Sequence, residues 1–134
     1  MAGDAHPDIV RLQPAGLAPA GGHYSHGVVA NGMVFISGQL PITPEGQRLS
    51  DAPFAVQAQQ VLDNVRATLL AAGCDVGHLL QVRVYLDDVA HWPEFNTLYA
   101  AWAGAARPAR AVVPTAPLHF GLKIEIEAVA LAPR

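Results

Sequence analysis

The sequence is poor in cysteine and in charge. Its 134 residues hold one cysteine, Cys74, and only 14% of them are charged, whereas 51% are hydrophobic. A lone cysteine excludes an intramolecular disulfide and a cysteine-rich zinc site. So little charge leaves much of a small monomer's surface apolar, and we therefore expect copies of the chain to bury surface against one another.

Basic clusters and long apolar runs are also missing. The eight Lys and Arg residues are scattered, with only Arg107 and Arg110 close together, and the net charge is -3. Nucleic-acid binding requires a basic face that displaces counterions from phosphates, so we expect no nucleic-acid partner. No stretch approaches the roughly 18 apolar residues that span a bilayer. The opening "MAGDAHPDIV" lacks the apolar core of a signal peptide, and we expect a cytoplasmic protein that does not enter the membrane.

The length predicts a single domain over residues 1–134, with residues 1–21 as an N-terminal arm. In this Ala-, Gly- and Pro-rich arm only "DIVRL" favours a strand. Asn31-Gly32 is a favoured two-residue turn, and it lies between two β-prone runs in "GVVANGMVFISGQ", which predicts a hairpin. Residues 39–50 contain two prolines and a glycine and are typical of a loop.

The clearest helix follows this loop. We expect Ser50 or Asp51 to cap it, Pro53 to occupy its first turn and Gly73 to close it. Its apolar stripe is spaced for one helix face and consists of Ala58, Val61, Leu62, Val65 and Leu69.

Two alternating strands and a second helix complete the pattern. The run "LLQVRVYLDD" predicts a strand with Leu80, Val82, Val84 and Leu86 on one face. The next helix is predicted to begin near Asp87 or Asp88, and its aromatic stripe of Trp92, Phe95, Tyr99 and Trp102 is interpreted as core packing. The last strand, residues 122–131, places Leu122, Ile124, Ile126, Ala128 and Ala130 on one face.

The predicted order is β-β-β-α-β-α-β, with a further short strand near 110–113. We expect an α+β fold in which both helices cover one face of a mixed sheet. The helix-free face is too apolar for full exposure to solvent and too polar for a core. This mixed character favours a subunit interface that contains a hydrated functional site. Its residues are Arg83, Tyr85, Glu125, Glu127, Val129 and Leu131.

Arg110 stands directly before an apolar run, and Glu125 and Glu127 follow on the last strand. A guanidinium presents a planar fork that matches a carboxylate, so Arg110 is a candidate anchor for a carboxylate ligand. An ion pair with Glu125 or Glu127 across an interface is the alternative. The two glutamates share one strand face, and periodicity does not distinguish them.

Several separated motifs occur in order between about Gly22 and Leu131: "YSHG" with "NGMVFISGQLP", "VLDNVRATLLAAG", "VYLDD", "FNTLYAAW", "RPAR" and "KIEIEAVA". Together they resemble the Rid (reactive intermediate deaminase) family, also called YjgF and, in older usage, L-PSP endoribonuclease. The resemblance implies a chorismate-mutase-like homotrimer with an active site in each subunit cleft. It implies hydrolysis of a small imino or enamino acid, such as 2-aminoacrylate or 2-iminobutanoate, to a 2-keto acid and ammonium, without metal or organic cofactor.

The resemblance also implies residue roles. Arg110 would anchor the substrate carboxylate, and Glu125 would handle the attacking water, because a carboxylate whose pKa is raised by burial can transfer that proton. Further residues would shape the pocket: Tyr24, which closes it, Ser37 and Gly38 in its wall, and Asn96, which supports the cleft.

Departures from the family pattern leave the substrate open. Val112 stands where many deaminating members have cysteine, and His119 lies in the divergent segment "TAPLHFG", where substrate side chains would be read. Two alternatives follow: a pathway-specific deaminase or hydrolase of an aminomuconate-like intermediate, or a non-catalytic homologue that binds small carboxylates or a protein partner. His23 and His26 could join His119 in a metal site, but no clear carboxylate or thiolate partner accompanies them, so we expect no metal.

Overall fold

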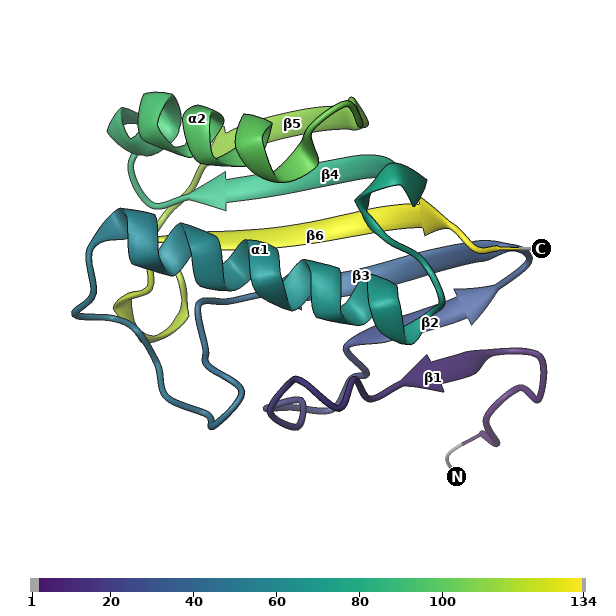
Figure 1. Ribbon diagram of the computed structural model, residues 1–134. Coiled ribbons are helices and arrows are strands. Elements are labelled where there is room, and N and C mark those ends of the chain that lie inside the picture. The colour runs from purple at the N-terminus through teal and green to yellow at the C-terminus, as the bar shows by residue number, and fades with distance from the viewer. Residues whose placement is uncertain (1–2, 134) are drawn as a thin grey trace.

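The computed structural model describes residues 3–133 as one six-stranded sheet with two helices on one face (Figure 1). The strand order is β1-β2-β3-β6-β4-β5, and only the β4–β5 pair is parallel. The predicted mixed α+β architecture is confirmed, and β5 is the further strand expected near 110–113. The elements are β1 (Val10–Leu12), β2 (Gly27–Ala30), β3 (Met33–Gln39), α1 (Phe54–Ala71), β4 (Leu79–Leu86), α2 (Trp92–Ala103), β5 (Ala109–Pro114) and β6 (Ile124–Leu131).

The hairpin between β2 and β3 is confirmed. Ala30 pairs with Met33, and the two turn residues between them, Asn31 and Gly32, have φ values of 50° and 71°. Positive φ at both positions is what a type I′ turn requires, and Asn and Gly reach it at low cost. The turn thus fixes the register that places Val34 and Ile36 in the core.

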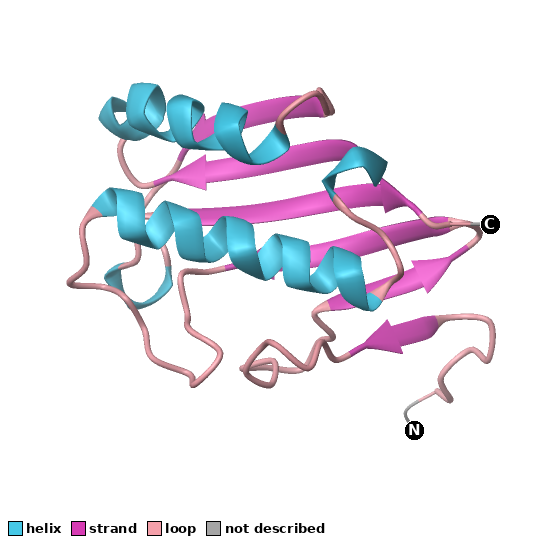
Figure 2. Ribbon diagram, in the orientation of Figure 1, coloured by secondary structure: helices cyan, strands magenta, loops and turns pink. Residues whose placement is uncertain are grey.

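The core lies between the helices and the sheet (Figure 2). The five predicted stripe residues of α1 are all completely buried. They pack against Val34 and Ile36 of β3, Val82 and Val84 of β4, and Ile124, Ile126 and Ala128 of β6. Each Val, Leu or Ile side chain among them contributes roughly 1.5–3 kcal/mol through its removal from water, and the two alanines contribute less.

The starts of the helices differ from the prediction. Neither Ser50 nor Asp51 caps α1, because Pro53 occupies the N-cap position and makes no side-chain cap hydrogen bond. The Ser50 hydroxyl instead donates to the Phe120 carbonyl, 2.8 Å away. Asp88 does cap a helix, but it is a short 3₁₀ turn, Val89–His91, that leads into α2.

Two apolar residues predicted in the core are exposed. The β4–β6 ladder shifts register between Leu79 and Gln81, and this bulge buries Leu79 and turns Leu80 outward. Trp92 begins α2 and is 41% exposed, so the aromatic packing is carried by Phe95 and Tyr99, with Trp102 at its margin.

Two buried amides on α1 tie the neighbouring loops to the helix. Gln57 donates to the carbonyls of Ser50 and Ala52 and accepts from the Lys123 amide. Asn64 donates to the carbonyls of Leu40 and Ile42 at 3.1 and 3.0 Å. These bonds satisfy loop carbonyls beside the core and hold residues 40–52 in place.

The helix-free face of the sheet has the mixed character that the sequence predicts. Phe35 and Leu131 are 43% and 54% exposed, and Val129 lies beside Phe35 in the ladder. Arg83 and Glu127, opposite one another on β4 and β6, form an ion pair of 3.7 Å. Within residues 3–133, no helix has the length and apolar character needed to cross a membrane.

Candidate functional site

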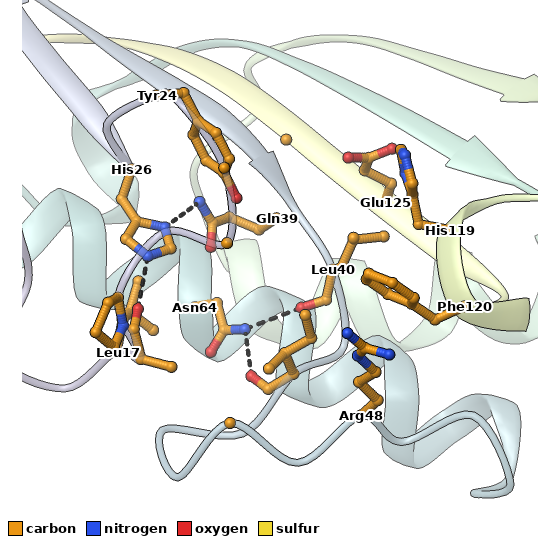
Figure 3. Close-up of a pocket in the computed structure, with 17 residues that line it drawn as sticks. Leu17, Tyr24, His26, Gln39, Leu40, Arg48, Asn64, His119, Phe120 and Glu125 are labelled. Atoms are coloured by element: carbon orange, nitrogen blue, oxygen red, sulfur yellow. Dashed lines mark hydrogen bonds between the residues drawn. The ribbon is translucent and has the colours of Figure 1, made fainter.

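A cavity of about 570 Å³ opens where β3 ends and β6 begins. Figure 3 shows Tyr24, His26 and Gln39 on one side of it and Glu125, His119 and Phe120 on the other, with Arg48 and Asn64 on the loop side. The arm contributes Leu17, and the loop after β3 contributes Leu40. One chain therefore builds this cavity from segments far apart in the sequence.

Glu125 reaches the cavity because the neighbouring strand makes room for it. The β3–β6 ladder is irregular between Ile36 and Gln39, and the bulge brings Gly38 beside the Glu125 side chain. A Cβ at Gly38 would lie 3.0 Å from the Glu125 Cδ, a contact too close for an ordinary side chain. The absence of a side chain at position 38 thus permits this position of the carboxylate.

The environment of Glu125 disfavours its charge. Burial raises the pKa of the half-buried carboxyl, a positive charge on His119 lowers that pKa, and the negative charge of Glu127 raises it. The net pKa is higher than that of an ordinary glutamate. Among residues 3–133, no donor forms a hydrogen bond to this carboxylate, so its oxygens are available to a ligand or water.

Glu127 is the next residue after Glu125 on the same face of β6, and its carboxylate has partners within the sheet. Its carboxylate accepts a short hydrogen bond from the Tyr85 hydroxyl and pairs with Arg83. That hydrogen bond is the main reason that the pKa of Tyr85 is raised. The structure therefore separates the two glutamates that periodicity leaves equivalent: Glu127 belongs to a surface network, and Glu125 faces the cavity.

The opposite wall is a fixed polar network. The His26 ring contacts the Ala18 carbonyl through Nε2 at 2.8 Å, so Nε2 carries a proton and donates. Gln39 Nε2 donates to the Ser37 carbonyl and, at 3.2 Å, to His26 Nδ1, which must then be the unprotonated acceptor. The Ser37 hydroxyl donates to the Ser25 carbonyl, which ties β3 to the segment that carries Tyr24.

Arg110 lies in a second cavity, of about 530 Å³, at the β5 edge of the sheet. Its guanidinium donates to Asn96 Oδ1 at 3.1 Å and lies 4.8 Å from the centroid of the Tyr99 ring. Burial raises the pKa of Tyr99, and the positive charge of Arg110 opposes this. Within residues 3–133, no carboxylate pairs with Arg110.

Arg110 and Glu125 project from opposite faces of the sheet. Arg110 pairs in register with the buried Val82 and contacts α2, whereas Glu125 alternates with residues whose side chains face the helices. Strand β4 separates β5 from β6. One chain therefore does not bring the guanidinium and the carboxylate together.

The other predicted site residues divide in the same way. Tyr24, Gly38 and His119 line the cavity of Glu125, and Asn96 lines that of Arg110. Ser37 lines neither cavity, and Val112 packs its side chain against the hydrophobic core. Across residues 3–133, no three His, Cys, Asp or Glu side chains are grouped as a metal site would require.

Sequence reasoning missed several residues of the first cavity. The sequence indicates a role for His26 only as a metal ligand, and no motif marks Gln39, Arg48 or Asn64 for a particular role. Their signal is weak because Arg48 lies in a loop, His26 and Gln39 lie at or next to the ends of strands, and the place of Asn64 on α1 at the cavity depends on the loop that packs against it. The pairing of Arg48 with Phe120 across 72 positions depends on the tertiary fold alone.

Comparison with known proteins gives a consistent result. The family model described as "Endoribonuclease L-PSP" matches residues 15–132. The chain is 36% identical over 124 residues to Protein HMF1 of Saccharomyces cerevisiae, and this alignment covers 92% of each of the two proteins. It is 40% identical over 118 residues to the 2-iminobutanoate/2-iminopropanoate deaminase of Escherichia coli K12. This alignment covers 85% of this chain and 91% of the relative. The crystal structure of the YjgF gene product of E. coli superposes with a TM-score of 0.83 at 35% identity, over 91% of this chain and 98% of the other.

Proposed function

The chain belongs to the L-PSP endoribonuclease family, which is the YjgF/Rid family, and from this premise we propose that it hydrolyses small 2-imino or 2-enamino acids to 2-keto acids and ammonium. The observation that carries the proposal is Glu125. It is a half-buried carboxylate with a raised pKa that faces a cavity and, within residues 3–133, has no hydrogen-bond donor.

Glu125 has the properties of the group that moves the proton. As the oxygen of a water attacks C2 of the imine, the Glu125 carboxylate accepts a proton from that water. When the substrate is the protonated imine, this attack gives a carbinolamine with a hydroxyl and an amino group on C2. The protonated Glu125 then returns its proton to that nitrogen. The C2–N bond breaks as the C2 hydroxyl becomes the ketone and gives its own proton to the departing ammonia, so that protonated imine and water yield 2-keto acid and ammonium. The pKa of Glu125 lies closer to neutral pH than that of an ordinary glutamate, which favours both acceptance and return of the proton. The chemistry requires no metal or organic cofactor.

Arg110 would hold the substrate carboxylate. Its guanidinium is oriented by Asn96 and by the face of Tyr99, and within the described residues no carboxylate neutralises it. Because Arg110 and Glu125 lie on opposite faces of one sheet, a complete site requires Arg110 of one copy to meet Glu125 of another. The exposed apolar residues of the helix-free face, such as Phe35 and Leu131, support such an assembly, and we propose a homotrimer in the cytoplasm.

A coupled assay tests this function. An amino-acid oxidase generates imino acids of increasing side-chain size, and semicarbazide traps the imine that remains. We expect the protein to accelerate imine loss, and Arg110→Ala to lower kcat/KM about 30-fold or more, as removal of one partner of a desolvated charge pair does. Arg11→Ala is the matched control, because Arg11 is exposed on β1 and donates only to the Ile9 carbonyl. No acceleration with any imine, or full activity in Arg110→Ala, would contradict the proposal.

A further inference from the structure

The cavity of Glu125 contains an arginine of its own chain. Arg48 lies in the loop after β3, and its Cζ is 3.5 Å from the centroid of the Phe120 ring (Figure 3). Within residues 3–133, none of the carboxylates forms an ion pair with Arg48. Its positive charge therefore faces the cavity without an acidic partner from the described chain.

The stacked geometry fixes how this charge is presented. A guanidinium that lies on an aromatic ring uses one of its flat faces, whereas its five N–H groups lie in the plane of the group. Its edge remains free to donate two parallel hydrogen bonds to a carboxylate. Phe120 thus restricts the orientation of Arg48 without occupying its donors.

The backbone places Phe120 in this position at a conformational cost. Phe120 has φ 60° and ψ 19°, a left-handed conformation that a bulky non-glycine residue seldom adopts. The Ser50 hydroxyl holds its carbonyl, and the Leu122 amide donates to the His119 carbonyl at 3.1 Å. Strain that the surroundings maintain at the rim of a cavity is typical of a functional constraint.

We propose that Arg48 is a specificity-determining residue that binds a second carboxylate, so that the cavity selects 2-imino acids with an acidic group at the end of the side chain. This inference rests on the proposed function. The substrate would extend from Arg110 of a second copy, past Glu125 at C2, to Arg48 at the far end. The cavity of about 570 Å³ is within the range that accepts ligands much larger than a four-carbon imino acid.

Binding of stable 2-keto acids tests this selectivity without catalysis. The probes are 2-oxoadipate and 2-oxohexanoate, which have the same chain length and differ in the terminal carboxylate. We expect calorimetric titration of the full chain to show about tenfold tighter binding of 2-oxoadipate, the preference that one charge-assisted pair supplies. Arg48→Gln should abolish this preference, and Arg48→Lys should retain only part of it because a lysine lacks the planar fork.

Arg11→Gln is the control, since it removes the same charge from an exposed site outside the cavity. Equal binding of the two probes, absence of binding of either, or a preference that survives in Arg48→Gln would overturn the inference. Arg48 is exposed, so its substitution should not prevent folding. An inactive protein with Arg48-dependent selectivity would count against the deaminase function alone. An active protein without this selectivity would count against Arg48 alone.

Discussion

Within one chain, the burial of Glu125 opposes the ionisation of a side chain that the proposed chemistry uses. Its pKa is raised in the folded state, mainly by burial, so the folded protein binds this proton more tightly than the unfolded chain does. Below the unfolded pKa of about 4.3 the group is protonated in both states. As the pH rises from there through the raised folded pKa, the carboxyl loses its proton in a partly buried place, and stability falls.

We therefore expect Glu125→Gln to abolish imine hydrolysis. In chains diluted until they do not assemble, we expect it to raise Tm at pH 7, because the amide cannot ionise and no Arg110 of a second copy offsets the cost of the charge. The difference in Tm should disappear near pH 4, grow as the pH rises through the raised folded pKa, and level off above it. Thermal unfolding between pH 4 and pH 8 measures it, with the exposed Glu45→Gln as control. A lower Tm for Glu125→Gln at pH 7 would show that the carboxylate stabilises the fold, contrary to this account.

Helix α1 positions the cavity through amides as well as through its apolar stripe. Asn64 is only 3% exposed and donates to two carbonyls of the loop that carries Arg48. In Asn64→Ala both carbonyls lose their donor, and we expect a loss of about 1–3 kcal/mol in the free energy of unfolding. Hydrogen exchange of residues 40–48 should accelerate.

The matched control is Gln59→Ala, whose amide bonds only to the exposed Asp63 on the same helix. It should change stability by less than about 0.5 kcal/mol. Urea unfolding of all variants at one protein concentration makes the comparison, since assembly would make stability concentration-dependent. An unchanged exchange rate in residues 40–48 of Asn64→Ala would show that other contacts hold the loop.

The same helix shows what the sequence can predict. Its apolar stripe, its closure at Gly73 and the Asn31-Gly32 turn follow from local patterns, and the structure confirms them. Its start and the burial of Asn64 are not local, because they depend on loops that fold back onto the helix. The exposure of Leu80 likewise depends on a bulge, which alternation of residue types does not predict.

The sequence predicts some of the residues that line the two cavities, and it does not predict how they are arranged. The family motifs identify Glu125 and Tyr24, and the structure places both at one cavity. That Arg110 faces the other side of the sheet follows from the register of β5 on β4, a parallel pairing joined through α2. Arg48 carries no motif, since only the fold brings it to Phe120.

The separation of Arg110 from Glu125 leads to a prediction about the proposed assembly. If each site takes Arg110 from one copy and Glu125 from the next, then Arg110→Ala chains alone should retain at most a few per cent of the activity, and Glu125→Gln chains alone should have none. Co-expressed in equal amounts, they assemble at random, and a site is intact only where a Glu125→Gln chain supplies Arg110 and an Arg110→Ala chain supplies Glu125. About one quarter of the sites meet this condition in a cyclic assembly, so we expect about one quarter of the wild-type activity.

The imine assay on differentially tagged, co-purified oligomers measures this recovery. Separately purified variants mixed without subunit exchange serve as the control and should show no more activity than the Arg110→Ala chains alone. No recovery from verified mixed oligomers would mean that one chain supplies both residues, which requires a rearrangement that carries Arg110 across the sheet from its place against Asn96 and Tyr99. Because β4 separates the two strands, shared sites require far less movement of the fold than sites within one chain.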